Sequence, residues 1–155
     1  MKIYLVAVGS RTPAWVKEGL RNYVQRMPSY CSLSLVEVPA VRRKHGDVDK
    51  IKREEGRSIL ARVPKNCHVV ALSEEGINIS TQGLADALGQ WINEGQDIAL
   101  LIGGADGLSQ ECHERANCCW SLSSLTFPHA LVRVIVAEQV FRAWSILSNH
   151  PYHRE

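Results

Sequence analysis

The sequence predicts an α/β fold, in which a parallel β-sheet carries helices on both faces. Short apolar runs alternate with longer segments whose apolar residues recur at helical spacing, in the order β-α-β-α-β-α-β-α-β-α. Several of these runs are apolar almost throughout, as expected of strands buried on both faces. The chain has 155 residues. A single domain over residues 1–155 can therefore bury roughly 68 to 70% of its unfolded surface without a metal or a disulfide.

The first expected strand is Ile3 to Val8, after which a glycine turns the chain. Thr12 can cap the following helix, and Pro13 suits its first position because a missing N–H costs nothing there. Apolar residues at positions 16, 20, 23, 24 and 27 form one helical stripe, and Pro28 ends the helix. A second strand is expected from Leu33 to Val38.

Either Asp47 or Asp49 can begin a second helix, whose apolar residues at positions 51, 59, 60 and 63 face inward. Gly56 weakens the middle of this helix by about 1 kcal/mol relative to alanine. The third strand is expected at Cys67 to Leu72. The chain then leaves the sheet through a loop at Ser73 to Gly76.

Ser80 is expected to begin the third helix and Gly95 to end it. The fourth strand is Ile98 to Ile102, a continuous apolar run that leads into a glycine-rich loop. Ser109 can cap a short helix that ends near position 116. The fifth strand is expected at Trp120 to Leu122.

The last expected helix begins after Pro128 and runs from His129 to about Ser148. Its apolar residues cover more than one side, which exceeds what contact with one sheet requires. We therefore expect the second apolar side to pack against another copy of the chain in a symmetric homodimer. The alternative is a helix wholly enclosed in its own domain.

The N-terminal segment and the cysteines indicate a cytoplasmic protein with no membrane partner. MKIYLVAVGSR contains six consecutive apolar residues before a glycine, too few for a signal peptide or a membrane span. Five cysteines make an odd number without a secretory context, so reduced thiols are expected. They are Cys31, Cys67, Cys112, Cys118 and Cys119.

Positive charge is concentrated in one part of the chain, although the net charge is only +2. Arg42, Arg43, Lys44 and His45 form a basic run, and further basic residues follow at positions 50, 52 and 53. Such a cluster can attract the phosphates of a nucleic acid. The alternative is a solvated linker beside a charged helix face.

Two loops and the C-terminal tail predict a ligand pocket. Glycines at positions 103, 104 and 107 let the backbone approach a ligand closely. The loop from Leu122 to Phe127 offers hydroxyls and backbone amides among apolar side chains, which suits a half-polar small molecule. The tail adds Tyr152, His153 and Arg154, which can do chemistry at the mouth of the pocket. The glycine loop lacks the lysine and serine of a Walker A motif, so by itself it indicates little.

Two other kinds of site have weaker support. Cysteines at positions 112, 118 and 119 with His113 suggest a metal cluster, but no spaced pair of CxxC elements accompanies them, so no metal is expected. Serines at positions 121, 123 and 124 precede His129 and Glu138, as a hydrolase would need. No G-x-S-x-G elbow is present, and loop hydroxyls commonly bond to nearby backbone.

Segments from both ends of the chain resemble one family of RNA methyltransferases. They are MKIYLVAVG and the following TPAWV, LIGGADGL at 101–108, WSLSSLTFPHALVRVIVAEQVFRAWSI at 120–146 and NHPYHRE at 149–155. These segments, with the chain length, resemble the ribosomal RNA large subunit methyltransferase H family of small SPOUT-class enzymes. The resemblance covers essentially the whole chain. It implies S-adenosylmethionine-dependent methylation of N3 of pseudouridine 1915 in bacterial 23S rRNA, on the ribosome.

The resemblance also implies a C-terminal deep trefoil knot, in which S-adenosylmethionine binds. Sequence rules alone disfavour such a knot, because threaded chains are rare. Many relatives carry Asp or Ala at the position of Ser73 and Lys at that of Ile77, so this chain departs from them at the edge of the pocket. Carried over by motif, the cofactor contacts are Leu72, Gly103, Leu122, Ser123, Ser124, Leu125, Thr126 and Phe127.

The tail carries the expected catalytic residues. A sulfonium methyl group is already a strong electrophile, so alignment and removal of the N3 proton matter most. His153 is the available base near neutral pH, Tyr152 can stack on or hydrogen-bond the uracil ring, and Arg154 can hold a phosphate or the charge on the carbonyls. Which residue takes the proton stays open, and His129 and Glu138 are supporting candidates.

No RRM, KH or OB signature is visible in the sequence. Contacts to RNA phosphates are therefore expected from Arg11, Arg42, Arg43 and Lys44.

Two interpretations from other functional classes remain. A non-enzymatic ribosome-binding factor would not bind S-adenosylmethionine, and a nucleotide hydrolase built on the glycine loop and the serines would release phosphate.

Overall fold

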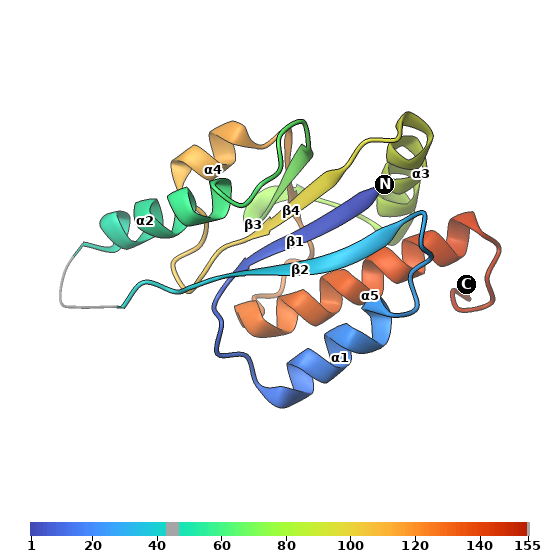
Figure 1. Ribbon diagram of the computed structural model, residues 1–155, viewed down its shortest axis with the longest axis horizontal. Coiled ribbons are helices and arrows are strands. Elements are labelled where there is room, and N and C mark those ends of the chain that lie inside the picture. The colour runs from blue at the N-terminus through green and yellow to red at the C-terminus, as the bar shows by residue number, and fades with distance from the viewer. Residues whose placement is uncertain (43–46, 155) are drawn as a thin grey trace.

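The computed structural model describes residues 1–42 and 47–154. Five parallel strands form one sheet in the order β2-β1-β4-β3-β5. The strands are β1 Lys2–Val8, β2 Ser32–Val38, β3 His68–Asn78, β4 Ile98–Ile102 and β5 Cys118–Ser121. The helices are α1 Ala14–Val24, α2 Val48–Leu60, α3 Thr81–Glu94, α4 Gln110–Arg115 and α5 His129–Leu147. Strands and helices alternate along the chain as predicted (Figure 1).

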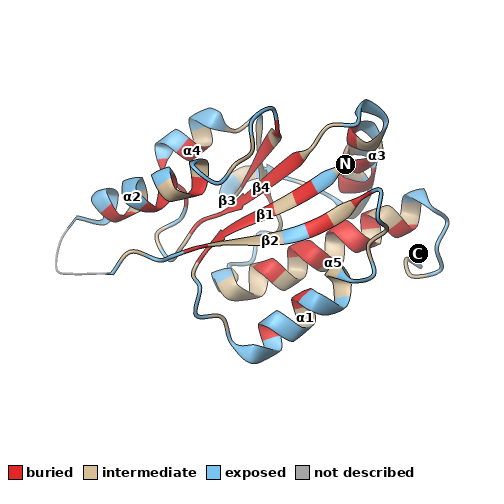
Figure 2. Cartoon of the chain, in the orientation of Figure 1, coloured by how far each residue is buried: buried red, intermediate tan, exposed pale blue. Residues whose placement is uncertain are grey.

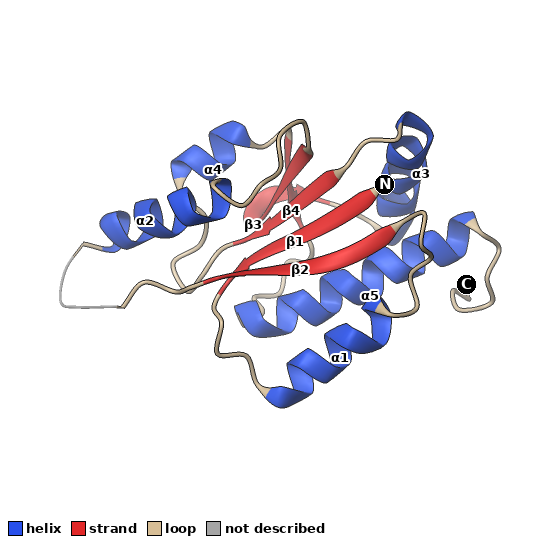
Figure 3. Ribbon diagram, viewed as in Figure 1, coloured by secondary structure: helices blue, strands red, loops and turns tan. Residues whose placement is uncertain are grey.

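Helices cover both faces of the sheet, which confirms the predicted architecture (Figure 3). The side chains of β1 alternate between the two faces, because successive residues of a strand point in opposite directions. Leu5 and Ala7 belong to a core with α1, α3 and α5, whereas Val6 and Val8 belong to a core with α2 and α4. Figure 2 shows the buried residues concentrated on the central strands and on the helix faces turned toward them.

Most of the predicted helix ends are confirmed by their capping contacts. The side chains of Asp47, Ser80 and Ser109 accept hydrogen bonds from the backbone N–H groups of Asp49, Gly83 and Cys112, at the starts of α2, α3 and α4. Gly95 ends α3 with a φ of 65°, a left-handed conformation that favours glycine.

Thr12 does not cap α1, contrary to the sequence prediction. Pro13 occupies the N-cap position without a side-chain cap. The Thr12 hydroxyl instead donates to Oε2 of Glu37 over 3.2 Å and accepts from Arg133. The buried arginine on α5 therefore competes for this hydroxyl, which a pattern of local residues could not indicate.

The predicted loop at 73–76 is part of a bulged strand. β3 continues to Asn78, and both Leu72 and Ile77 pair with Trp120 of β5. Gly76 makes this path possible, because a Cβ there would lie 2.5 Å from the backbone carbon of Trp120. β5 also begins two residues earlier than predicted, since Cys118 pairs with Val70.

Helix α5 lies beneath the sheet with α1 and α3 on its flanks (Figure 1). A Cβ on Gly19 of α1 would lie 3.3 Å from Cγ1 of Val134, and one on Gly89 of α3 would lie 3.2 Å from Cδ2 of Leu147. The chain itself thus covers much of the apolar surface from which a homodimer was predicted. Homodimer formation stays a prediction.

Within the part of the chain that the structure describes, no helix has both the length and the apolar character to cross a membrane.

Candidate active site

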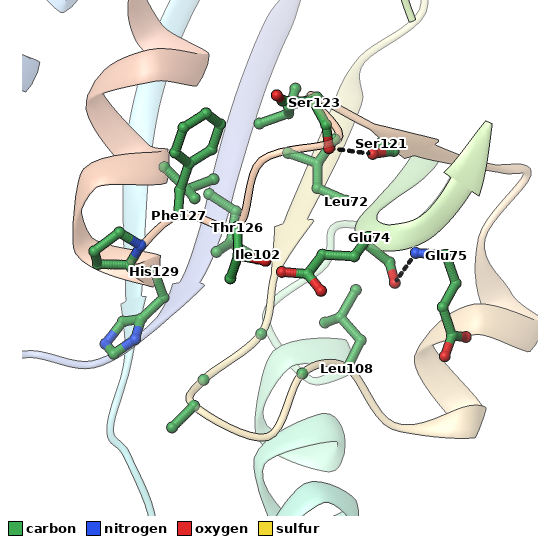
Figure 4. Close-up of a pocket in the computed structure, with 18 of the residues that line it drawn as sticks. Leu72, Glu74, Glu75, Ile102, Leu108, Ser121, Ser123, Thr126, Phe127 and His129 are labelled. Carbon is green, nitrogen blue, oxygen red and sulfur yellow. Dashed lines mark hydrogen bonds between the residues drawn. The ribbon is translucent and has the colours of Figure 1, made fainter. Parts of the chain in front are cut away.

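A cavity of about 470 Å³ opens at the carboxyl ends of β3, β4 and β5 and extends to the first turn of α5 (Figure 4). Cavities of this size commonly bind small molecules. In parallel sheets, ligands bind outside the carboxyl ends of the strands, as here. The two predicted loops do meet at one site, and they are joined there by the exit of β3, which is a bulged part of that strand and not the predicted loop.

The glycine loop that follows β4 folds tightly against itself. The backbone N–H of Gly107 donates to the carbonyl of Gly104 over 3.0 Å, and Gly107 has a φ of 85°. A Cβ on Gly103 would lie 2.4 Å from the backbone carbon of Gly107. The loop can adopt this shape only if residue 103 has no side chain, so its backbone forms one wall of the cavity.

The segment between β5 and α5 is held by its own serines. The Ser121 hydroxyl donates to the carbonyl of Ser123 over 3.0 Å, and the hydroxyl of Ser123 accepts from the backbone N–H of Leu125 over 3.0 Å. Both hydroxyls therefore organise local backbone, which gives no support to the hydrolase interpretation.

All the predicted cofactor residues except Ser124 line the cavity. The exposed Ser124 is not among the lining residues. The lining residues that were predicted come from three separate parts of the chain. They are Leu72, Gly103, Leu122, Ser123, Leu125, Thr126 and Phe127.

Carboxylates and a histidine also line the cavity, and the sequence interpretation did not assign them to the cofactor. Glu74 and Glu75 come from the bulge of β3, and Asp106 comes from the glycine loop. Figure 4 shows the Glu74 side chain pointing from β3 toward the segment that leads into α5. His129 lines the wall at the start of α5. Glu74 and Glu75 were missed because the sequence pattern indicated a loop at residues 73–76, whereas β3 continues through them.

The C-terminal tail folds back on α5 and α1. The Tyr152 hydroxyl donates to Oε1 of Glu138 over 3.0 Å and lies 3.4 Å from the hydroxyl of Tyr23. Its ring contacts that of Phe141 edge to face, with centroids 4.8 Å apart. Burial, aided by the hydrogen bonds with Tyr23 and Glu138, raises the pKa of Tyr152, so its phenol stays a proton donor at neutral pH.

The tail also contacts an arginine of α5. Arg142 of α5 donates from Nε to Oε1 of Glu138 over 2.8 Å, and its Nη1 lies 3.3 Å from Nδ1 of His153. The hydrogen bond with Glu138 raises the pKa of Arg142, which keeps the guanidinium charged. His153 is half-buried by these contacts, and Arg154 is exposed.

The tail and the cavity lie at opposite ends of α5 within one chain. The cavity contacts His129 at the first residue of the helix, and the tail follows its last residue, Leu147. The helix has 19 residues, which corresponds to a length of about 28 Å. Figure 1 shows the tail leaving the last turn of α5 and curling back beside that end of the helix. Within one chain, Tyr152, His153 and Arg154 therefore lie away from the mouth of the pocket, and their action there stays a prediction.

Two of the predicted RNA contacts lie at the same edge of the sheet as the cavity. Arg11 follows β1 and Arg42 follows β2, and both side chains are exposed. Because β1 and β2 are parallel, their carboxyl ends meet at one edge. The other two predicted RNA contacts, Arg43 and Lys44, lie outside the described residues.

The cysteines are thiols, and burial raises the pKa of each of them. Cys118 lies 3.9 Å from Nε2 of His68, and Cys119 lies 3.8 Å from Nδ1 of His113. These are two separate pairs. Among the residues that the structure describes, no three His, Cys, Asp or Glu side chains are grouped to hold a metal ion.

Comparison with known proteins agrees with this architecture. A family profile described as Predicted SPOUT methyltransferase matches residues 1–153. A solved probable methylase family protein from Haemophilus influenzae superposes with a TM-score of 0.59 at 13% identity, over 99% of this chain and 70% of that one. At that identity, the likeness supports the fold alone.

Curated relatives match over the full length. The ribosomal RNA large subunit methyltransferase H of Thioalkalivibrio sulfidiphilus is 54% identical over 156 residues, which cover 100% of both chains. The protein of the same name from Methylococcus capsulatus is 52% identical over 99% of this chain and 100% of its own. The chain therefore belongs to the ribosomal RNA large subunit methyltransferase H family of SPOUT methyltransferases and is an rRNA methyltransferase.

Proposed function

We propose that the protein transfers the methyl group of S-adenosylmethionine to N3 of pseudouridine 1915 in 23S rRNA, acting on the ribosome in the cytoplasm. The observation that carries this proposal is the cavity at the carboxyl edge of the sheet, where the predicted cofactor residues converge. The names of the full-length relatives support an rRNA substrate. Pseudouridine N3 and the ribosome come from the resemblance of the motifs.

The residues of the cavity fit a molecule with an apolar ring and charged ends. Leu72, Leu122 and Phe127 offer apolar surface to an adenine, beside the bare backbone at Gly103. The carboxylate of Glu74 can attract a positive charge or bind hydroxyls. When bound, S-adenosylmethionine supplies an electrophilic methyl group on a positively charged sulfur.

The position of the tail makes a second copy of the chain part of this proposal. About 28 Å of helix separates the cavity from the tail within one chain. If Tyr152, His153 and Arg154 act on the substrate, they must reach the cavity of a partner in a homodimer. The contacts of Tyr152 with Glu138 and Phe141 would present the tail to the partner in a fixed conformation.

RNA binding is proposed for the exposed basic residues at the carboxyl edge. Arg11 and Arg42 lie on the same edge of the sheet as the cavity, so both can contact phosphates around a uracil that enters it. Arg43 and Lys44 are proposed to extend this surface.

The trefoil knot and the single domain over residues 1–155 also belong to the proposal. Residues on both sides of Ser124, in the segment before α5, line the cavity together with the loop at residues 103–108, and this proximity supports the proposal of a threaded chain. Pulling the two ends of one molecule apart tests the knot. A knotted chain stops short of the full contour length, whereas an untied chain reaches it.

The decisive experiment uses cofactor with a labelled methyl group and ribosomes from a strain that lacks the modification. Label is expected at N3 of one pseudouridine of the 23S rRNA. Label elsewhere would contradict the assigned target, and no transfer with intact ribosomes would contradict the proposed activity.

Two neighbouring serines provide a matched test of the cavity. Ser123→Ala removes the acceptor for the Leu125 N–H and should weaken cofactor binding several-fold, whereas Ser124→Ala should leave binding unchanged. Calorimetric titration with S-adenosylmethionine measures both. Equal effects of the two substitutions would place the cofactor elsewhere.

Subunit mixing tests the shared site. Gly103→Ala should eliminate cofactor binding, and deletion of residues 152–155 should eliminate methylation while cofactor binding is kept. Each variant alone is expected to be inactive. Mixed dimers should recover activity, since one of their two sites combines an intact cavity with an intact tail. If mixing restores nothing while mixed dimers form, the tail does not act on its partner.

A further inference from the structure

The guanidinium of Arg142 has a fixed orientation between α5 and the tail. Its Nε and Nη2 both donate to Oε1 of Glu138, one helical turn earlier. The Glu138 oxygen also accepts from the Tyr152 hydroxyl over 3.0 Å. The guanidinium carbon of Arg142 lies over the ring of Tyr152, 4.9 Å from its centroid. These contacts leave Nη1 directed at Nδ1 of His153, 3.3 Å away.

A guanidinium group has only hydrogen-bond donors, so Nδ1 of His153 must be the acceptor in this contact. A neutral imidazole carries one N–H and one acceptor nitrogen. The proton of His153 must therefore be on Nε2. No side chain or backbone group within residues 1–42 and 47–154 is hydrogen-bonded to Nε2, which is thus available to a ligand.

We infer that Arg142 is a positioning residue that makes His153 a hydrogen-bond donor through Nε2, rather than the base that removes the N3 proton. This inference rests on the proposed function, since it assigns a role to the tail in that reaction. A nitrogen that already carries a proton cannot accept another one. The Nε2–H group can instead donate to a uracil carbonyl oxygen next to N3.

With His153 as a donor, the methyl transfer needs no protein base. The N3 proton leaves to solvent water, and the negative charge spreads from N3 onto the neighbouring carbonyl oxygens. The Nε2–H of His153 stabilises that charge. N3 then forms its bond to the methyl carbon while the carbon–sulfur bond breaks and its electron pair goes to sulfur. His153 keeps its own proton throughout.

Several charged and hydroxyl groups surround the contact between Arg142 and His153. Arg142 brings positive charge beside the imidazole of His153, and Arg154 follows it in the chain. Arg26, two residues after the end of α1, lies over the ring of Tyr152, with its guanidinium carbon 5.1 Å from the centroid. Glu138 is the acidic group of the cluster, and it is occupied by Arg142 and Tyr152. Tyr23 contacts the hydroxyl of Tyr152.

The tautomer can be measured directly in the folded protein, independently of methylation. Long-range proton–nitrogen NMR on protein labelled with ¹⁵N-histidine distinguishes the two neutral tautomers, and His153→Gln assigns the signal. His153 is expected to show a protonated Nε2. His150 is an internal comparison, because its Nδ1 accepts from the Tyr152 backbone N–H over 3.2 Å and requires the same tautomer. Arg142→Met should shift the His153 signal toward a mixture and leave His150 unchanged. A protonated Nδ1 in the wild type would overturn the inference.

Activity gives a second, separate readout. Glutamine offers an amide N–H near the position of Nε2 and an oxygen for Arg142, but it is not a base. His153→Gln should therefore retain most of the single-turnover rate, within about fivefold, whereas His153→Ala should lose at least tenfold. His113→Gln, far along the chain from the tail, is the matched control.

The pH profile separates the two roles of His153. If His153 is a donor, the methylation rate rises with pH as N3 ionises. The wild type and His153→Gln then have the same pH profile. As a base, it would add an acidic limb in the wild type that the glutamine variant lacks, and that result would refute the inference. A wild type that binds ribosomes and transfers no methyl group would instead refute the proposed function, while the NMR result would stand.

Discussion

Arg133 of α5 donates from Nη1 to Oε2 of Glu37 on β2 over 3.2 Å, and the arginine side chain is only 2% exposed. The same guanidinium donates from Nη2 to the carbonyl of Val8 at the end of β1, over 2.8 Å. Thr12 adds a contact over 3.0 Å. One buried side chain thus connects α5, two neighbouring strands and the start of α1, close to the edge of the sheet where the cavity opens.

Replacement of Arg133 with methionine should lower the free energy of unfolding by about 2 to 4 kcal/mol, because backbone carbonyls of β1 lose their donor inside the protein. Urea unfolding measures the change. Arg21→Met on the exposed side of α1 is the matched control and should change stability by less than about 0.5 kcal/mol. Equal stability of the two variants would show that the buried contacts contribute nothing.

Gly56→Ala should destabilise the protein, although alanine is the better helix former by about 1 kcal/mol. A Cβ at Gly56 would lie 2.1 Å from Oγ of Ser109, which caps α4 and cannot move away without losing that cap. Overpacking of this kind costs about 1 to 3 kcal/mol. Thermal unfolding of the purified variant checks the sign.

Two further variants test the cause of that change. Adding Ser109→Gly to Gly56→Ala should recover most of the stability, because it removes the clashing side chain and glycine is an acceptable N-cap. Gly89→Ala in α3 should be neutral or stabilising, since its Cβ would meet only the flexible end of Leu147. Failure of the double variant to recover would assign the loss to something other than the clash.

Stability should fall as the pH rises from 9 to 11, in part because of Cys31. Burial raises the pKa of this thiol from 9.0 to about 11, an effect that the positive N-terminus partly offsets. Above pH 9 the unfolded chain loses the proton while the folded chain keeps it. The stabilisation is therefore complete below pH 9 and declines by up to about 1.4 kcal/mol per pH unit until the folded thiol ionises.

Urea unfolding between pH 7.5 and pH 10.5 measures this dependence in the wild type and in Cys31→Ala. The substitution lowers stability at every pH by removing buried sulfur, but it should flatten the alkaline decline. Cys119→Ala is the comparison at a half-buried cysteine, where burial also raises the pKa, and it should flatten the decline less than Cys31→Ala does. An unchanged slope in Cys31→Ala would contradict the assignment.

Charge reversal of Arg11 and Arg42 should weaken methylation of ribosomes while leaving cofactor affinity unchanged, since both side chains lie outside the cavity lining. Each lost phosphate contact should reduce the slope of log affinity against log salt by about 0.7 to 0.9. Ribosome binding at several salt concentrations measures this slope.

Lys65→Glu is the control for that experiment. Lys65 is exposed but precedes β3, so it lies at the amino edge of the sheet, away from the cavity. If Lys65→Glu and the reversal of Arg11 and Arg42 weakened binding equally, the effect would come from net charge and not from a surface at the carboxyl edge.

The sequence alone determined the alternation of strands and helices, the parallel sheet and most of the capping residues. These features depend on residues close together in the chain, such as the apolar run of β4 or Ser80 three positions before Gly83. The motif resemblance likewise identified the family, and all but one of the cofactor residues that it predicted line the cavity, because it compares whole segments with proteins of the same fold.

Only the tertiary structure decided how distant residues meet. Thr12 is taken by Arg133, which is 121 positions away, and Gly56 is required by Ser109 from another helix. The bulge that brings Glu74 into the cavity depends on the backbone of β5. The length of α5 separates the tail from the cavity of the same chain. Each outcome depends on contacts made after the elements pack, and local patterns carry no information about those contacts.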